Sequence, residues 1–433
     1  MTAVGESWGR YPRARHRIVT VDDRHAPLPA FEGSALPHGN GRSYGDSCLN
    51  DQGTLLHTVK MDRYLAFDPA TGVLECEAGM SLAQVIDTLL PRGWFPAVTP
   101  GTRHVTVGGA IANDVHGKNH HLAGSFGAHL LGLELLRSDG SRLTCNRSLH
   151  PGWFAATIGG LGLTGLITRA RLQLRPVAGP WMDNREQRFS DLRGFFEVSA
   201  QHASDEYSVA WVDCLAAGRQ LGRGIFSSAN HSPVDRGAVP ERRRRAVPFT
   251  PPFSLVNPLS LRLFNQLHYA RSAREARIGV CPIDRFFYPL DAIAGWNRLY
   301  GPRGLLQYQC VVPPAAAQEA IGEILQRIAR AGSGSMLAVL KQFGPGNSPG
   351  MLSFPREGTT LALDFPNRGD TTLRLLSALD EVVLAAGGAV YPAKDARMSP
   401  RMFSASFPRL AEFREYVDPR FSSGLWRRVL ENP

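Results

Sequence analysis

Residues 98–121 combine a glycine-containing loop with a dense cluster of polar side chains. Gly108 and Gly109 carry no side chain, so the backbone there can turn tightly and present amide N–H groups to an anion such as a pyrophosphate. His116 and Lys118 follow shortly after. A histidine near neutrality can accept the proton of an alcohol while a hydride leaves the adjacent carbon, and contact with a cofactor or a sugar is the rival role. The pattern predicts a nucleotide cofactor beside a reactive centre.

Two further loops, at 39–46 and at 159–165, have the same density of small residues. Each loop alone fits an ordinary tight turn, whereas all of them together can surround one extended dinucleotide. None is a Rossmann fingerprint, because in none does a strand lead into a Gly-x-Gly-x-x-Gly that opens a helix, and none ends in the Gly-Lys-Ser/Thr of a P-loop. The sequence therefore argues against the common NAD and ATP folds.

The order of these loops resembles the PCMH-type FAD-binding domain that vanillyl-alcohol oxidases, aldonolactone oxidases and related flavoenzymes share. Within that superfamily the sequence is much more similar to the family of decaprenylphosphoryl-β-D-ribose 2′-oxidases. This resemblance extends from about Trp8 to the C-terminus and keeps the family's order of motifs. The matching strings are Gly-Arg-Ser-Tyr-Gly-Asp at 41–46, Pro-Gly-Thr-Arg at 100–103, Thr-Val-Gly-Gly-Ala-Ile-Ala at 106–112, His-Gly-Lys-Asn-His-His at 116–121, Leu-Gln-Tyr-Gln at 306–309, Gly-Pro-Gly-Asn at 344–347 and Ala-Lys-Asp at 393–395.

The resemblance implies an α+β fold with a two-subdomain PCMH-type FAD-binding domain and a substrate domain in which helices cover an antiparallel sheet. We expect the FAD-binding domain at 1–178, the substrate domain at 179–390, and a C-terminal segment at 391–433 that returns to the FAD-binding domain. A length of 433 residues also favours two domains over one core. A break in composition at 176–180 fits the first boundary.

Hydrophobic periodicity and turn residues predict the individual elements. In the first domain we expect a strand at 73–77, a helix capped by Ser81 and closed at Arg92-Gly93, a hairpin over 130–145 that turns at Asp139-Gly140, and a strand at 165–174. In the second we expect helices at 189–202, 315–331 and 370–386, and strands at 206–214, 305–312, 336–343 and 360–365. Strands separated by helices favour a sheet with helices on one face.

FAD is the cofactor that the resemblance implies. Many relatives attach it covalently through a histidine in the first glycine loop, but no histidine occurs between Gly39 and Asp46, and His38 lies directly before that loop. We therefore expect non-covalent FAD with Tyr44 close to its ring. The expected FAD contacts are Gly39, Asn40, Gly41, Arg42, Ser43, Tyr44, Gly45, Asp46, Gly101, Thr106, Val107, Gly108, Gly109, Asn113, Asp114, Val115, His116, Ile167 and Tyr391.

The candidate catalytic residues are Lys394, His116 and Tyr44. A buried ammonium at Lys394 can stabilise negative charge that develops on a reduced flavin ring, or it can contact a substrate oxygen directly. A lysine next to an aspartate, here Asp395, is ordinarily a solvated surface charge, and the resemblance is what favours the functional role.

Substrate contacts are also implied by the resemblance. Their types suit a sugar phosphate, since amides bind hydroxyls, an ammonium binds phosphate, and an aromatic ring covers an apolar face. Strand alternation by itself puts Gln307 with Gln309 and Lys341 with Phe343 on common faces, which also fits the polar outer side of a sheet. The expected substrate contacts are Lys118, Gln307, Gln309, Lys341, Phe343, Thr360 and Lys394.

The segment 358–365 departs from the family's best-known members, which carry a substrate-pocket cysteine where this chain has Ala362. The resemblance thus implies an altered lining of the substrate pocket, and inhibitors directed at that cysteine should fail. No metal site is expected, because His120 and His121 are adjacent in sequence and have no acidic partner at a ligand-like spacing.

Composition and charge limit the remaining classes. Hydrophobic residues at 43% and charged residues at 20% are typical of a globular protein, and the six cysteines are scattered without metal-site or disulfide spacing. No apolar run is long enough to cross a membrane and no signal peptide is evident, so we expect a cytoplasmic or peripheral membrane location. The net charge of +10 includes the run Arg242–Arg245, which fits either a solvated loop or contact with anionic lipid headgroups. No basic and aromatic pattern indicates nucleic-acid binding.

These observations lead to one main hypothesis and two alternatives. The main hypothesis is FAD-dependent oxidation of the 2′-hydroxyl of a polyprenylphosphoryl-β-D-ribose, a lipid-linked sugar phosphate, to its 2′-keto form. The keto product would then need a separate NAD(P)H-dependent keto-reductase to complete an epimerisation to the arabinose form, which the resemblance links to cell-wall arabinan. An alditol or aldonolactone oxidase is the second hypothesis, because fold does not fix substrate. A flavin-fold partner subunit without catalytic activity is the third.

Overall fold

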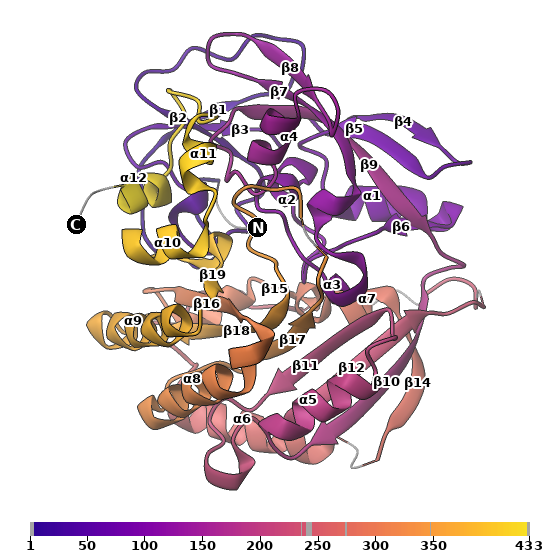
Figure 1. Ribbon diagram of the computed structural model, residues 1–433, viewed down its shortest axis with the longest axis vertical. Coiled ribbons are helices and arrows are strands. Elements are labelled where there is room, and N and C mark those ends of the chain that lie inside the picture. The colour runs from indigo at the N-terminus through magenta and orange to yellow at the C-terminus, as the bar shows by residue number, and fades with distance from the viewer. Residues whose placement is uncertain (1–3, 235, 240–244, 273–274, 347, 431–433) are drawn as a thin grey trace.

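The computed structural model in Figure 1 describes residues 4–234, 236–239, 245–272, 275–346 and 348–430. Two parts pack against each other. An N-terminal part, joined by the last helices of the chain, lies above a large sheet whose far face is covered by helices (Figure 1). The cavity described below lies between these two parts.

Two sheets and several short helices build the N-terminal part. The first sheet is parallel, in the order β1 (Arg17–Thr20), β3 (Thr54–His57), β2 (Ala35–His38). The second is antiparallel, in the order β4 (Tyr64–Asp68), β5 (Val73–Glu77), β9 (Leu166–Pro176), β7 (Leu130–Leu136), β8 (Arg142–Cys145), with β6 (Trp94–Pro96) paired to β9. The helices are α1 (Leu82–Leu89), α2 (Val107–Ala112), α3 (His120–Ala123) and α4 (Pro151–Thr157).

Helix α1 shows how local sequence sets these elements. Ser81 and Gln84 form a capping box, in which the serine hydroxyl accepts from the Gln84 amide and the glutamine side chain accepts from the Ser81 amide. The apolar positions predicted from the spacing are buried, and Gly93 ends the following turn with a positive φ of 79°. The expected hairpin is also confirmed, since Gly140 turns between β7 and β8 with a φ of +84°.

The second part is built on a large sheet in which every pair of neighbouring strands is antiparallel. Its order is β14 (Arg277–Pro282), β10 (Trp181–Phe189), β12 (Gly224–His231), β11 (Tyr207–Val212), β17 (Val339–Phe343), β18 (Gly358–Pro366), β16 (Leu305–Val312), β19 (Ala389–Val390). Helices α5 (Leu192–Gln201), α8 (Ala317–Ala331) and α9 (Asp370–Ala385) cover one face (Figure 1). The α+β fold class is confirmed.

Side chains alternate between the two faces of this sheet. On β16, Leu306, Tyr308 and Cys310 point into the main core, where they meet the apolar faces of α8 and α9. The residues between them, Gln307 and Gln309, therefore point to the opposite face, toward the N-terminal part.

The remaining elements of this part flank the sheet. They are α6 (Pro258–Arg271), α7 (Ile283–Phe287) and the parallel pair of β13 (Arg245–Ala246) with β15 (Ile293–Ala294). The exposed Arg245 belongs to β13, whereas Arg242–Arg244 of the expected basic loop lie outside the described residues. No helix in the described ranges is long and apolar enough to cross a membrane.

The C-terminal segment returns to the N-terminal part. It contains α10 (Pro400–Ser406), α11 (Leu410–Arg414) and α12 (Gly424–Leu430), and Phe421 forms a parallel bridge with Ala35. The domain boundaries at residues 178 and 390 stay a prediction. All six cysteines are described and free, and each except the half-buried Cys48 is buried.

One expected helix was placed too early. Phe189 is the last residue of β10, and α5 begins at Leu192, because Asp191 caps it by accepting from the Gly194 amide at 2.9 Å. Strands β10, β12 and β14 were not expected at all. Only Met182 and Phe189 of β10 are buried, so that strand lacks the apolar alternation on which the prediction depended.

Candidate active site

A cavity of about 1450 Å³ lies between the glycine loops and the open face of the large sheet. The loop side contributes most of the expected FAD contacts, and strands β16, β17 and β18 contribute most of the expected substrate contacts. The expected residues that line it are Gly39, Asn40, Gly41, Arg42, Ser43, Tyr44, Gly101, Thr106, Gly108, Gly109, Asn113, Val115, His116, Lys118, Ile167, Gln307, Gln309, Lys341, Thr360, Tyr391 and Lys394.

Five expected site residues lie behind the cavity wall instead. Asp46 pairs with Arg428, and Asp114 accepts from the Gly127 amide at 2.8 Å. The other three are packed: Val107 is fully buried, a Cβ on Gly45 would lie 1.8 Å from the Asp395 carbonyl oxygen, and Phe343 packs against the rings of His116 and His120. These residues support the wall rather than form its surface.

The loops fit a dinucleotide that needs close backbone approach. A Cβ on Gly39 would lie 2.4 Å from the Thr106 hydroxyl, and Gly41 has a φ of +58° that favours glycine. Thr106 caps α2 by accepting from the Gly109 amide at 3.1 Å. Beside the loops, the Nε atom of Arg42 is buried and has no hydrogen-bond partner among the described residues, so a cation is available to an anionic cofactor.

Lys394 and Tyr44 meet at one end of the cavity. The Lys394 Nζ atom lies 4.1 Å from the centre of the Tyr44 ring, and the Tyr44 amide donates to the Ala393 carbonyl at 2.9 Å. Burial lowers the pKa of Lys394 to about 8, and the nearby Asp364 carboxylate acts in the opposite direction. Burial raises the pKa of Asp364 to about 6, and Gln307 donates to that carboxylate at 2.5 Å. Lys394 thus has a charged partner inside the cavity.

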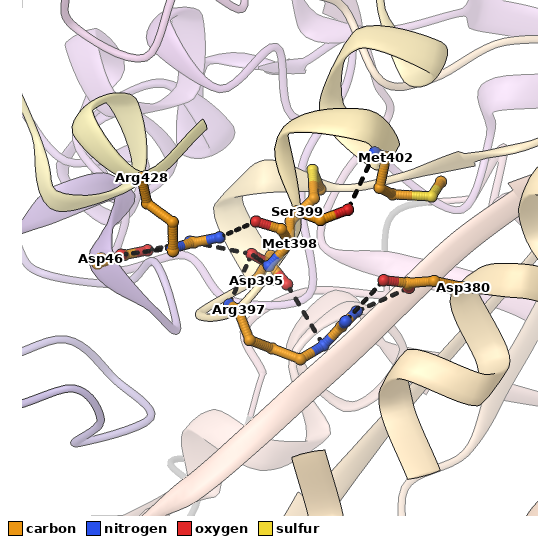
Figure 2. A network of polar contacts seen from close by, with 8 residues as sticks. All are labelled: Asp46, Asp380, Asp395, Arg397, Met398, Ser399, Met402 and Arg428. Atoms are coloured by element: carbon orange, nitrogen blue, oxygen red, sulfur yellow. Dashed lines mark hydrogen bonds and ion pairs between the residues drawn. The ribbon is translucent and has the colours of Figure 1, made fainter. Parts of the chain in front are cut away.

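The partner of Lys394 is not the aspartate that follows it in sequence. Figure 2 shows the Asp395 carboxylate accepting from the Met398 amide at 2.6 Å and from the Arg428 guanidinium at 3.2 Å. Arg397 donates to the same carboxylate through its amide and binds Asp380 through both terminal nitrogens (Figure 2). The reading of Lys394 as a solvated charge paired with Asp395 therefore does not hold. Asp395 instead anchors the turn that presents Lys394.

The ring of His116 is held at both nitrogens. The Gln309 side-chain amide lies 2.8 Å from Nε2, and Lys341 Nζ lies 3.1 Å from Nδ1. Gln309 also donates to the Thr360 hydroxyl at 3.1 Å, and that hydroxyl donates to the Cys310 carbonyl at 2.8 Å. Because the hydroxyl proton is used on Cys310, its oxygen must accept, which makes the NH₂ group of Gln309 the donor to both neighbours.

This direction of donation assigns the protons of His116 and Lys341. A neutral imidazole has one N–H, and since Nε2 accepts, the proton lies on Nδ1 and faces Lys341. In this arrangement Lys341 Nζ accepts that proton as a neutral amine, and it donates to the Gly117 carbonyl at 3.2 Å. Burial, with Lys118 and Lys394 nearby, lowers the pKa of Lys341 to about 7. Burial and Lys341 also lower the pKa of His116 well below its ordinary value.

Lys118 lines the cavity but is already engaged. Its Nζ donates to the Phe286 carbonyl and lies 4.3 Å from the centre of the Phe286 ring. Burial lowers the pKa of Lys118 to about 8.

The site also contains a residue that sequence reasoning missed. Asp364 lies on the same face of β18 as Thr360 and Ala362, and strand alternation from those two positions could have found it. Ala362 itself lines the cavity and pairs in register with Gln309 and Val339 on the flanking strands.

A glycine-loop fold that shares one cavity with a polar sheet defines an FAD-dependent oxidoreductase, and comparisons with known proteins agree. The FAD binding domain family matches residues 30–146. Over 98% of its length the chain is 36% identical to decaprenylphosphoryl-beta-D-ribose oxidase of Mycolicibacterium smegmatis and covers 96% of that protein. The chain belongs to the family of these FAD-dependent oxidases, and FAD is its cofactor.

Two further relatives show which parts are shared. An uncharacterised protein of Streptomyces coelicolor is 38% identical over 81% of the chain and is covered completely. L-gulonolactone oxidase of Mus musculus is 31% identical over 32% of the chain, which covers 31% of that protein. The likeness to the lactone oxidase thus covers about a third of the chain.

Proposed function

We propose that the protein oxidises the 2′-hydroxyl of a polyprenylphosphoryl-β-D-ribose to the 2′-keto form. The observation that carries this proposal is the open face of the sheet, where Gln307, Gln309 and Lys341 project into the same cavity as Lys394. Amides and an amine there suit the hydroxyls and phosphate of a glycosyl phosphate. The Mycolicibacterium smegmatis relative is named a decaprenylphosphoryl-beta-D-ribose oxidase, which supports the same substrate.

Bound FAD supplies the hydride acceptor for this reaction. Oxidation breaks the C–H and O–H bonds of the carbinol and forms a C=O bond, so the enzyme must also receive a proton. We assign this proton to His116. When the substrate hydroxyl replaces the Gln309 amide at His116 Nε2, that nitrogen takes the proton, while Lys341 on the Nδ1 side of the ring is left to contact the phosphate.

Lys394 and Tyr44 act on the other side of the reacting carbon in this proposal. The Lys394 ammonium, held at the Tyr44 ring and near Asp364, stabilises negative charge where the hydride is received. Oxidation of a soluble alditol or aldonolactone is less favoured, because the match to the lactone oxidase covers only 32% of the chain. A partner subunit without catalytic activity is disfavoured by the assembled cluster of Tyr44, His116 and Lys394.

The proposal includes two partners. The keto product requires a separate NAD(P)H-dependent reductase for epimerisation, and a lipid-linked substrate requires contact with a membrane surface. Neither the reductase nor its docking site is assigned to particular residues.

An anaerobic titration tests the proposed reaction. Adding a short-chain prenylphosphoryl ribose should bleach the absorbance of the oxidised flavin, whereas the matched 2′-deoxy compound, which lacks the reacting hydroxyl, should leave it unchanged. A yellow protein that stays oxidised with both compounds would remove the assigned substrate. Bleaching by alditols or lactones alone would favour the soluble-sugar alternative.

A further inference from the structure

Exposed apolar side chains gather in one segment of this protein. Among the described residues, more than half of the large hydrophobic side chains that are exposed lie between residues 234 and 293. Phe249 and Phe253 are 67% and 66% exposed, and Leu255 is 43% exposed. A concentration of this kind marks an interaction surface rather than the scattered apolar residues of an ordinary surface.

Helix α6 presents its apolar face outward. Leu259, Leu263 and Leu267 recur at four-residue intervals along one face and are 78%, 58% and 45% exposed. Only Leu261 and Asn265 of this helix are buried. A helix that packs on a protein core normally shows the reverse distribution, so the outer face of α6 is built for another apolar environment.

The inner face of α6 is firmly attached beside the active site. Leu261 packs in one cluster with Trp296 and Tyr44, whose ring is next to Lys394. Asn265 donates to the Asp213 carboxylate at 2.7 Å. The exposed leucines of α6 are therefore held at a fixed position relative to the cavity.

The same surface continues to the wall of the cavity. Val247, Pro248 and Thr250 line the cavity, while Phe249 between them is exposed. Ile293, which pairs with β13, both lines the cavity and is 36% exposed. Phe249 and Ile293 thus bring exposed apolar surface to the rim of the cavity.

The charge of this segment indicates which kind of partner binds to its surface. From residue 234 to residue 293 the sequence has ten arginines, no lysine and five acidic residues, and so carries a net positive charge. Arg245, Arg262, Arg271 and Arg277 are exposed in the structure. A second copy of the chain on a two-fold axis would bring these arginines against their own equivalents, whereas anionic lipid headgroups would neutralise them.

We propose that this surface, made of α6 and residues 249–255, binds the face of an anionic membrane and aligns the cavity with lipid-linked substrate in the bilayer. The alignment with substrate rests on the proposed function, while the membrane contact does not. Leucines and phenylalanines enter the boundary between headgroups and acyl chains, and arginines at the edge contact the headgroups.

Co-sedimentation of the holoenzyme with sucrose-loaded vesicles tests this surface. We expect binding to vesicles that contain phosphatidylglycerol, weaker binding to pure phosphatidylcholine, and loss of the difference at high salt. The double variant Leu259→Gln/Leu263→Gln should reduce binding by about tenfold or more, because two anchoring side chains are lost. The matched control Leu131→Gln/Leu149→Gln alters two leucines that are 38% and 46% exposed elsewhere, and it should bind as the unaltered protein does.

Flavin absorbance and near-ultraviolet circular dichroism verify that each variant is folded. Turnover of a short-chain substrate in detergent should not change in Leu259→Gln/Leu263→Gln, because α6 is outside the cavity wall. Vesicle binding without any turnover would reject the proposed substrate, but it would still support the proposed membrane-binding surface. Equal binding by the leucine variant and the unaltered protein would overturn the inference, as would a dimer in solution that the leucine variant converts to monomer.

Discussion

The Nζ atom of Lys341 lies 3.1 Å from Nδ1 of His116, and the hydrogen bonds around them fit a neutral lysine amine. The groups that face this amine are His116, Lys118 and Lys394, and none of them is an anion. An anionic substrate would supply the missing counter-charge. Lys341 is therefore placed to gain a proton when a phosphate binds.

Proton uptake on binding is the first prediction. The pKa of Lys341 is lowered to about 7 in the free protein, and a bound phosphate raises it. Above that pH the free amine is neutral, so binding should take up about one proton, whereas below it the amine is already charged and uptake should vanish. Titration calorimetry with a prenylphosphoryl ribose, repeated in buffers of different ionisation enthalpy, measures the number of protons taken up. Lys341→Met should abolish the uptake and the exposed control Lys60→Met should keep it, so equal uptake in both variants would contradict the assignment.

Lys394 and Asp364 give the second prediction. Lys394→Ala should lower the rate of flavin reduction by substrate about a hundredfold or more, while FAD stays bound. If the ammonium is required, activity falls as pH rises through about 8, the pKa of Lys394. The Asp364 carboxylate raises that pKa, so Asp364→Asn should move the alkaline limb of the rate of flavin reduction to lower pH. An unmoved limb would show that Asp364 does not act on Lys394.

The third prediction concerns attachment of the cofactor. Acid denaturation should release all of the flavin, and mass spectrometry should find the polypeptide unmodified. His38 lines the cavity, but it is only 3% exposed and its Nδ1 atom lies 3.0 Å from the Cys48 carbonyl, so that nitrogen is already engaged. A flavin adduct on any peptide would contradict the prediction.

Thiol chemistry gives the fourth prediction. Ala362 lines the cavity, while burial raises the pKa of Cys48 and of Cys310 to about 12 and keeps both thiols unreactive. The native protein should resist small thiol reagents, whereas Ala362→Cys should take up one equivalent and lose turnover as it does so. Peptide mapping locates the label, and labelling of a native cavity thiol other than Cys48, which lines the cavity, would show that segment 358–365 was misaligned.

The fifth prediction tests the anchor drawn in Figure 2. Arg428→Met leaves the Asp46 carboxylate, 6% exposed, without its cation, and leaves Asp395, 3% exposed, with only the longer Arg397 ion pair at 3.9 Å. We expect unfolding free energy to fall by about 3 kcal/mol and flavin to be lost more easily. Arg401, which pairs with Glu381 at the surface, is the matched control, and Arg401→Met should cost less than about 1 kcal/mol. Urea titration monitored by flavin fluorescence measures both, and equal effects would show that the buried pairing is unimportant.

The sequence was sufficient for elements whose apolar alternation is strong. Strand 305–312 has the predicted bounds, because Leu306, Tyr308 and Cys310 all enter the core. Strands β10 and β14 escaped prediction because their positions are held by pairing with neighbours rather than by their own apolar pattern. Pairing partners that are distant in sequence leave no local signal.

The site was predictable in its residue types and not in its contacts. The motifs identified Lys394, His116 and Lys341, but they did not identify Asp364 on β18, whose carboxylate raises the pKa of Lys394, whereas the neighbouring Asp395 accepts from the Met398 amide. The neutral state of Lys341 likewise depends on hydrogen bonds that join separate elements. Charge states of buried groups follow from tertiary surroundings, which no motif encodes.

Ala35 pairs with Phe421, and the amide of Tyr44 donates to the carbonyl of Ala393. During translation, the glycine loops leave the ribosome long before the segment that closes them is made. Contacts of such long sequence separation form late, so the wall of the FAD cavity stays incomplete until then. Its apolar residues are exposed during this time, and chaperones can bind them. We therefore expect flavin capture to follow translation, so that riboflavin supply affects the yield of mature protein at its last folding step.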